Sequence, residues 1–201
     1  MPNTAFYTLL QIPKDVYYNE NKRGMYGDMQ LISNIFGQFD SSNGKPFLYR
    51  KEIRTSCVEF IIRSDNNPKD NPVELHPKFR MITKEVPESF FDRDQARVKV
   101  TLNPIVQKAG SGNSKKVPLK SAGDIRSYVN RIFQRNGIEP ISLDIGKPIN
   151  DVGFKKGHKI TVSKVDVEGI VKVLDKESFK DSVRSGIGSA KRFGCGLVLV
   201  K

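Results

Sequence analysis

The 201-residue sequence contains few of the side chains that hold metals or form disulfides, with two cysteines and two histidines. Cys57 and Cys195 form no Cys-x-x-Cys pair, and His76 and His158 lie far apart in the sequence. A structural zinc site takes four Cys or His ligands in most proteins, so we expect no metal or cofactor. Each cysteine lies in an apolar run typical of a strand, which favours buried free thiols.

Long apolar segments are also absent from the sequence. No apolar run approaches the roughly 18 residues that a membrane-spanning helix requires. The chain does not begin with the basic and then apolar regions of a signal peptide, and we find no basic amphipathic helix with a broad apolar face. We therefore expect a cytoplasmic protein in a reducing compartment, with no membrane partner.

Acidic residues are scarce in the second half of the chain. Residues 1–96 hold 13 Lys or Arg and 13 Asp or Glu, whereas residues 97–201 hold 21 and 9. The formal net charge of +12 therefore resides wholly in the second half. Cations that neutralise phosphates release counterions and so drive binding. This asymmetry indicates a polyanionic partner, with nucleic acid favoured over a membrane surface.

Hydrophobic periodicity predicts strands and helices in a repeating order. In the first half we expect strands over residues 5–12, 46–50, 57–63 and 79–86. We also expect a helix over residues 25–39, with Met25, Met29, Ile32, Phe36 and Phe39 on one face. In the second half we expect strands over residues 97–102, 140–145, 159–173 and 196–200, and helices over residues 121–136 and 175–185. This order predicts an α+β fold of two tandem ferredoxin-like domains, related to RNA-recognition motifs, with antiparallel sheets. The predicted domains are residues 1–92 and 93–201.

Residues 186–196 contain four glycines and two adjacent cations, and they join the last predicted helix to the last strand. Glycine lets main-chain N–H groups converge on an anion, and the segment is neither a Walker A loop nor a Rossmann fingerprint. Two interpretations stay open, namely a clamp for a phosphate backbone and an ordinary glycine-rich connection. The candidate RNA contacts in this loop are Gly186, Gly188, Lys191, Arg192 and Gly194.

Further candidate RNA contacts lie in three basic segments of the second half. One is a predicted hairpin tip, one is the helix over residues 121–136, and one is the loop that precedes this helix. These candidates are Lys155, Lys156, Lys159, Arg126, Arg135, Lys115, Lys116 and Lys120. The major groove of A-form RNA is deep and narrow, so contacts to phosphates and to the shape of the stem should dominate.

The glycine-rich loop resembles the signature loop of the CasE family of CRISPR-repeat endoribonucleases from type I-E systems. Three other stretches agree in order and spacing: residues 98–104 followed by 116–120, residues 167–175, and Tyr26 before the first helix. The resemblance is strong over residues 97–201 and weaker over residues 1–40.

This resemblance implies tandem ferredoxin-like domains that bind the stem-loop of a CRISPR repeat. It also implies cleavage without metal at the 3′ base of that stem by attack of the 2′-hydroxyl, which leaves a 2′,3′-cyclic phosphate and a 5′-hydroxyl. The product then stays bound as the 3′ handle of the guide RNA, together with the other backbone subunits of the Cascade complex.

The family pattern places a tyrosine three residues before a catalytic histidine. Tyr26 matches the tyrosine, but Met29 occupies the histidine position, and a thioether transfers no proton near neutral pH. Our candidate catalytic residues are Tyr26 and His158, the latter in the basic hairpin; a carboxylate such as Asp28 is unfavourable beside phosphates.

Two functions therefore remain open. The first is a repeat-processing endoribonuclease, and the second is a catalytically weak or inactive subunit that binds the handle. A generic RNA-recognition-motif protein is disfavoured, because residues 191–198 lack the second stacking aromatic of its RNA-binding signature.

Overall fold

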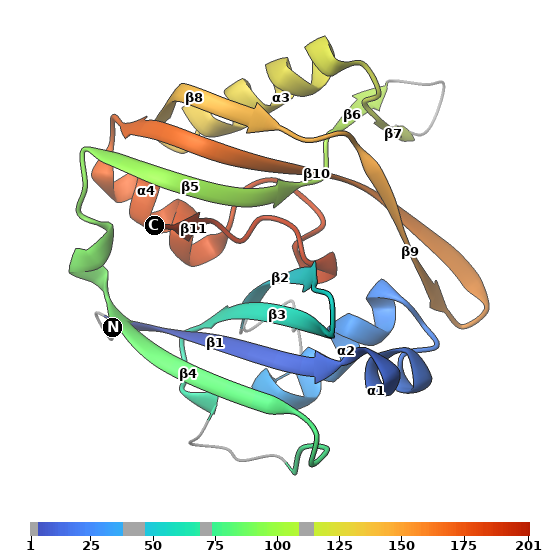
Figure 1. Cartoon of the computed structure of the whole chain (residues 1–201). Helices are drawn as coiled ribbons and strands as arrows, with labels where there is room; N and C mark the ends of the chain where they lie inside the picture. The colour runs from blue at the N-terminus through green and yellow to red at the C-terminus, as the bar shows by residue number, and fades with distance from the viewer. Residues whose placement is uncertain (1–3, 38–46, 69–73, 109–114) are drawn as a thin grey trace.

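The computed structural model describes residues 4–37, 47–68, 74–108 and 115–201 (Figure 1). The first half forms a four-stranded antiparallel sheet with two helices against one face. In spatial order its strands are β2 (Phe47–Ile53), β3 (Cys57–Ser64), β1 (Thr4–Pro13) and β4 (Arg80–Pro87). The helices are α1 (Lys14–Glu20) and α2 (Met25–Phe36).

The second half repeats this arrangement after the short helix η2 (Glu88–Phe91). Its strands, in spatial order, are β11 (Leu199–Val200), β5 (Gln95–Leu102), β10 (His158–Val173) and β8 (Ile138–Ile145). Its helices are α3 (Ala122–Gln134) and α4 (Lys176–Ser185). Two hairpins project from this sheet: β6 (Ile105–Lys108) pairs with β7 (Lys115–Pro118), and β9 (Ile149–Lys155) pairs with the first part of β10.

The two sheets have the same strand order when the strands of each half are numbered along the chain and the two hairpins are left out. In each sheet the fourth strand pairs with the first, the first pairs with the third, and the third pairs with the second. This is the strand order of a β-α-β-β-α-β ferredoxin-like unit. The described residues between β3 and β4 contain no α-helix, so only the second half has both helices of the unit. The predicted α+β class with antiparallel sheets is confirmed.

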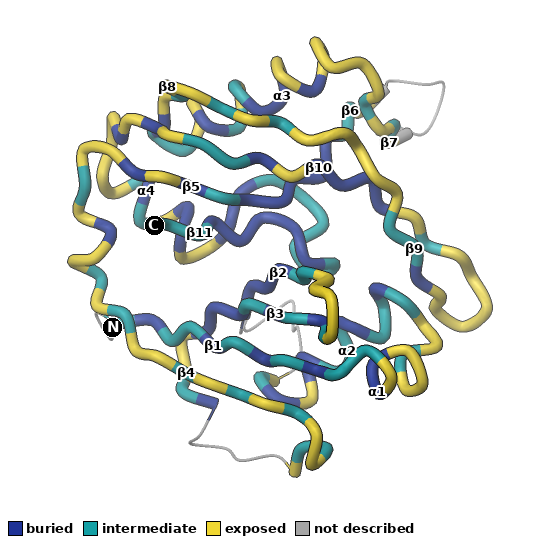
Figure 2. Tube along the Cα trace, in the orientation of Figure 1, coloured by how far each residue is buried: buried dark blue, intermediate teal, exposed yellow. Residues whose placement is uncertain are grey.

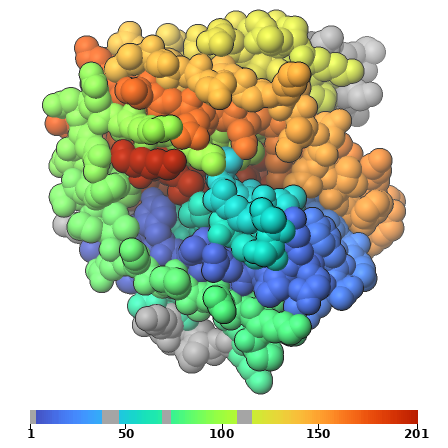
Figure 3. Space-filling model, viewed as in Figure 1, coloured from blue at the N-terminus to red at the C-terminus, as the bar shows by residue number. Residues whose placement is uncertain are grey.

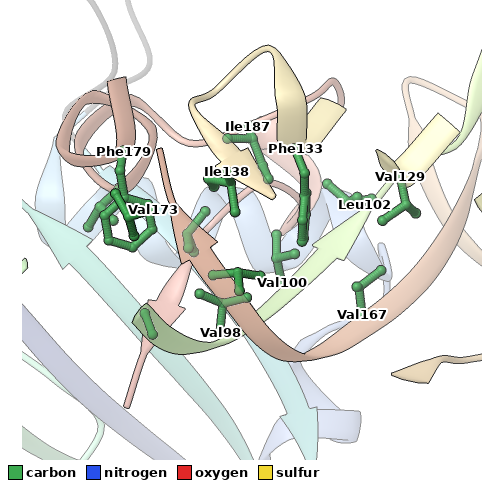
Figure 4. Close-up of a cluster of buried hydrophobic side chains, with 14 of the residues drawn as sticks. Val98, Val100, Leu102, Val129, Phe133, Ile138, Val167, Val173, Phe179 and Ile187 are labelled. Carbon is green, nitrogen blue, oxygen red and sulfur yellow. The ribbon is translucent and has the colours of Figure 1, made fainter. Parts of the chain in front are cut away.

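Each sheet covers its own hydrophobic core (Figure 2). In the second half, alternate residues of β5 point toward the helices, because successive side chains of a strand face opposite sides. Val98, Val100 and Leu102 pack there against Val129 and Phe133 of α3 (Figure 4). The core of the first half is more aromatic, with Phe47, Tyr49 and Phe60 all buried.

The predicted strands and long helices lie within a few residues of the observed ones, with one clear exception. The last strand covers only residues 199–200, because Gly196 instead donates a hydrogen bond to the Thr101 carbonyl from within the loop. Helix α1 and strands β6 and β7 were not expected, and no range was predicted for β9, the first strand of the hairpin. Cys195 is buried as predicted, whereas Cys57 is only half-buried because it begins strand β3.

Charged side chains join the two sheets at strand β2. The Arg50 guanidinium lies 2.9 Å from Glu52 and 2.8 Å from Asp166 of β10, and Lys99 of β5 lies 2.7 Å from Glu52. The Glu52 side chain is only 9% exposed. Burial alone would raise the pKa of Glu52, but hydrogen bonds from Lys99 and Arg50 outweigh burial and lower the pKa from 4.5 to about 2.

We expect Glu52→Gln to destabilise the protein by about 1.5–3 kcal/mol at neutral pH, because it removes a charged hydrogen-bond acceptor. A carboxylate with a lowered pKa stabilises the fold fully above its unfolded-state pKa, and this contribution disappears as the pH falls toward the folded-state value. The difference between wild type and variant should therefore shrink from pH 4.5 to about pH 2. Urea unfolding across this range measures it.

The exposed residue Glu139 of β8 provides the control, and Glu139→Gln should change the free energy of unfolding little. A Glu52→Gln effect that stays constant from pH 7 to pH 2 would contradict a role for its charge.

Candidate nucleic-acid interface

Three segments that are distant in the sequence meet at the first turn of α2. Met25 is fully buried there against Val162 of β10 and Cys195 of the glycine-rich loop. Ala190 and Phe193, which flank and end the short helix η3 (Lys191–Phe193), pack against the same cluster. The structure therefore brings the helix of Tyr26, the basic hairpin and the glycine-rich loop to one place.

The β9–β10 hairpin is fastened to α2 through main-chain contacts. Gly24 and Gly153 form an isolated β-bridge, and the Phe154 N–H donates to the Arg23 carbonyl over 3.1 Å. A Cβ on Gly153 would lie 2.9 Å from the Tyr26 nitrogen, so only glycine allows this approach. Figure 3 shows the orange atoms of the hairpin against the blue atoms of the first two helices.

This attachment places the cations of the hairpin beside Tyr26. The Lys155 Nζ lies 5.8 Å from the centroid of the Tyr26 ring. His158 is the direct backbone partner of Lys155 across the hairpin, and both are exposed. Lys156 and Gly157 form the turn between them, with positive φ angles of 48° and 81°. The predicted hairpin tip is confirmed, and both catalytic candidates lie near Lys155.

Met29 is half-buried on α2, one turn after Tyr26, and Asp28 points into the protein instead. Asp28 is 1% exposed and accepts hydrogen bonds from Tyr17 Oη and Asn21 Nδ2, each over 2.6 Å. Lys51 Nζ also donates to Asp28 over 2.7 Å. These partners occupy the carboxylate, so Asp28 is a structural group of the junction.

Lys51 lies between two carboxylates, those of Asp28 and Asp151, and so forms part of a row of alternating charges. Its Nζ lies 3.8 Å from Asp151 of β9, and Asp151 accepts a hydrogen bond of 2.7 Å from Lys164 of β10. Burial opposes the charge of Asp151, but Lys164 and Lys51 outweigh burial and lower its pKa. We call Asp28, Lys51, Asp151 and Lys164 the charge chain. It links α2 and β2 of the first half to the hairpin of the second.

The glycines of the loop permit close packing against strand β2. A Cβ on Gly194, which has a φ of +79°, would lie 3.0 Å from the Tyr49 ring. One on Gly186 would lie 2.9 Å from a Leu48 methyl group and from the Gly196 carbonyl. Gly188 also has a positive φ, but a Cβ there would make ordinary contacts of 3.5 Å.

Lys191 of the loop already has partners for its charge within the protein, and the main chain at Arg192 is also hydrogen-bonded. Lys191 Nζ donates to the carbonyls of Ser185 and Gly186 at the end of α4, over 2.8 and 2.6 Å. The Arg192 carbonyl accepts a hydrogen bond of 3.1 Å from Tyr49 Oη. These contacts favour a connecting role for the loop, and its action as a phosphate clamp stays a prediction.

Ion pairs divide the other cations of the second half into two groups. Cations on β5, on α4 and at the C-terminus have acidic partners within 4.0 Å. These are Arg97, Lys99, Lys176, Lys180, Arg184 and Lys201. Within the described ranges, several cations on and near α3 and on the hairpin have no acidic partner. These are Lys116, Lys120, Arg126, Arg135, Lys147, Lys155, Lys156 and Lys159.

The unpaired group contains most of the predicted RNA contacts outside the glycine-rich loop. Lys120 and Arg126 lie at the start of α3, while Arg135 caps the opposite end of that helix. The side chain of Lys115 lies outside the described residues. Sequence reasoning missed Lys147 because it stands alone between Gly146 and Pro148, and it missed Lys51 and Lys164 because their acidic partners come from distant segments.

In the described part of the chain, no group of three potential ligands from His, Cys, Asp and Glu is arranged to hold a metal ion. No helix in those ranges has the length and apolar character needed to cross a membrane.

The sequence model of a family described as CRISPR associated protein matches residues 13–201. No curated protein matches the sequence. Among solved structures, the chain is similar to CRISPR endoribonuclease Cse3 bound to a 19-nucleotide RNA, with 18% identity and a TM-score of 0.81. That match covers 98% of this chain and 99% of the Cse3 chain.

The chain is also similar to the CRISPR-associated protein Cas6e from Escherichia coli strain K-12, with 20% identity and a TM-score of 0.71. This match covers 97% of this chain and 98% of Cas6e. A third similar chain, at 16% identity and a TM-score of 0.70, belongs to a CRISPR RNA-guided surveillance complex, and the match covers 96% and 98% of the two chains. At these identities the likeness establishes a shared fold.

We expect Gly194→Ala to destabilise the protein more than Gly157→Ala. Both glycines have a positive φ, which costs other residues about 1–2 kcal/mol. Only Gly194 faces a fixed neighbour, the Tyr49 ring, whereas Gly157 faces open space. Overpacking at Gly194 should add about 1–3 kcal/mol. Urea unfolding of both variants measures the difference. Equal losses in the free energy of unfolding would contradict the prediction, because the Tyr49 ring would then move aside at no cost.

Proposed function

The chain belongs to the family of CRISPR-associated proteins, and from this premise we propose that it is an endoribonuclease that processes CRISPR-repeat RNA. It binds the stem-loop of the repeat and cuts the RNA at the 3′ base of the stem. One observation carries the proposal: Lys155 lies beside the Tyr26 ring and pairs with His158 across a hairpin whose cations Lys156 and Lys159 have no acidic partner within the described ranges.

The proposed reaction uses the RNA's own 2′-hydroxyl as the nucleophile. Its oxygen forms a bond to the adjacent phosphorus while the bond from phosphorus to the 5′-oxygen breaks, which leaves a 2′,3′-cyclic phosphate and a 5′-hydroxyl. A base takes the 2′-hydroxyl proton and an acid protonates the leaving oxygen. An imidazole can accept or donate a proton, so His158 can perform either transfer, whereas the Tyr26 phenol serves as a proton donor or an orienting group.

Positive charge supports this reaction at the phosphorus. The five-coordinate transition state gathers negative charge, which fixed cations stabilise more strongly than they stabilise the ground state. The Lys155 Nζ lies 5.8 Å from the centroid of the Tyr26 ring, and we assign it this role. No step of the proposed reaction requires a metal ion.

We further propose that residues 1–92 and 93–201 act as two domains with separate tasks. The first supplies Tyr26, and the second supplies the cations that hold the RNA. After cleavage the RNA remains bound as the 3′ handle of a guide, with this chain among the backbone subunits of a Cascade complex. A chain of similar fold in a CRISPR RNA-guided surveillance complex supports this placement.

A second function, handle binding without efficient cleavage, is favoured by Met29. Its thioether lies one helical turn from Tyr26, at the position where the related family has its catalytic histidine. In this case the same cations bind the RNA, and the junction at Tyr26 positions the RNA without cleaving it.

We expect the wild type to cut its cognate repeat hairpin in excess chelator, with a 2′,3′-cyclic phosphate on the product. Met29→His should speed single-turnover cleavage, and His158→Ala and Tyr26→Phe should slow it, because loss of a general acid or base costs about 10²–10⁴-fold in rate. Tyr18→Phe is the control, since Tyr18 is exposed on α1 and outside the junction.

Tight binding without cleavage by the wild type would establish the handle-binding alternative. Cleavage that stops in chelator would contradict the proposed chemistry, and the absence of hairpin binding would contradict both functions.

A further inference from the structure

A cationic cleft lies beside the start of α3, away from the junction at Tyr26. Its hollow of about 360 Å³ is bounded by Lys120, Arg126 and Lys147. These cations come from the segment before α3, from α3 itself and from the link between β8 and β9. Ile125 and Ile145 are among the apolar residues that line the same hollow. We call this hollow the α3 cleft.

The cations of the α3 cleft are not neutralised by the protein. No acidic side chain lines the cleft, and none of its three cations has an acidic partner within the described ranges. Two acids neighbour lining residues in the sequence. Asp124 receives a hydrogen bond of 2.7 Å from the Ser121 hydroxyl as part of the helix cap. Asp144 precedes Ile145 on β8, where successive side chains face opposite sides of the strand. The α3 cleft therefore has an unbalanced positive charge.

A second cleft, beside β2, has a different balance of positive and negative charge from the α3 cleft. It has a similar size, about 400 Å³, and it is also lined by several cations. There, however, Arg50 and Lys99 contact Glu52, and Lys164 contacts Asp151. The cations of that cleft are therefore neutralised by ion pairs that connect the two sheets. Of the two clefts, only the α3 cleft has cations that are free to bind a ligand.

The arrangement suits a phosphodiester flanked by sugar and base. Three cations from separate segments surround one hollow, and a guanidinium such as that of Arg126 can hold two phosphate oxygens at once. The partly exposed side chain of Ile145 presents an apolar surface on which a ribose or a base can lie. This combination of charge and apolar lining matches a nucleotide within a strand.

The α3 cleft is too far from Lys155 to bind the phosphate that is cut. Strand β9 separates Lys147 from Lys155, and its seven residues span about 20 Å. One phosphate cannot contact both lysines. A strand bound at the junction must therefore reach the α3 cleft with a different phosphate.

We propose that the α3 cleft is a second RNA contact, which binds a backbone phosphate distant from the cut and contributes affinity without contributing to the chemistry. This inference rests on the proposed function, because it takes the cleaved RNA as its ligand. Lys147 is the residue that it adds to the expected RNA contacts.

The test combines Lys147→Ala with two lengths of a repeat hairpin made non-cleavable by a 2′-deoxy sugar at the cut. Binding is measured by fluorescence anisotropy between 50 and 200 mM salt. Loss of one phosphate contact should reduce the magnitude of the slope of log K against log salt by about 0.7–0.9. Lys172→Ala is the control, since Lys172 is an exposed cation at the far end of β10, beyond the hairpin.

With the long hairpin, Lys147→Ala should reduce the slope and weaken binding at low salt. Single-turnover cleavage of the natural RNA at saturating protein should keep its wild-type rate. With a hairpin shortened at the end away from the cut, the variant and the wild type should bind equally.

An unchanged slope for Lys147→Ala, or an equal loss with both hairpins, would overturn the inference while leaving the proposed function intact. A cleavage rate that falls at saturation would also overturn it, because Lys147 would then act on the chemistry. Failure of the wild type to bind either hairpin would instead overturn the proposed function, and this inference with it.

Discussion

The buried carboxylate of Asp28 places the strictest requirement on this structure. A charge that is 1% exposed needs partners, because an unpaired buried ion costs several kcal/mol. Lys51 of β2 supplies the opposite charge, and it lies close enough to Asp151 of the hairpin to be shared between the two halves. The charge chain can therefore form only when α2, β2 and the hairpin occupy their observed places.

The candidate site depends on that arrangement. The hairpin that contributes Asp151 and Lys164 to the charge chain carries Lys155 a few residues further on, beside the Tyr26 ring. The glycine-rich loop reaches the same junction through Cys195, which packs with Met25 and Val162. Tyr26 alone is an ordinary surface phenol, and it becomes a candidate for RNA chemistry because these distant segments bring cations to it.

Hydrophobic periodicity in the sequence predicted most of the strands and helices, and the charge distribution predicted an excess of cations in the second half. The alternation at Val98, Val100 and Leu102 identified β5, and the similar rhythm of the two halves indicated paired ferredoxin-like units. The excess of cations in the second half agrees with the group of cations on and near α3 and on the hairpin that have no acidic partner within the described ranges. The hairpin tip was predicted, but the range of strand β9 was not, because its glycine and its acidic residue serve tertiary contacts with α2 and Lys51, which no local pattern records. Lys51 was not predicted for the same reason, since its partners Asp28 and Asp151 come from other segments.

The glycine-rich loop shows why a motif can indicate a family while leaving its physical role open. Its glycines were predicted either to clamp a phosphate or to form an ordinary connection, and Gly194 and Gly186 allow the close approach of Tyr49 and Leu48 of the first half. Close packing between the halves is thus sufficient reason for glycine at these two positions.

The most direct measurement is an experimental structure of the chain with its repeat hairpin, made non-cleavable by a 2′-deoxy sugar at the cut. Our central claim is that the scissile phosphate binds at the junction of α2 and the β9–β10 hairpin. We expect this phosphate within hydrogen-bond distance of Lys155 and next to Tyr26. A scissile phosphate bound on the open face of either sheet, away from both residues, would contradict the claim.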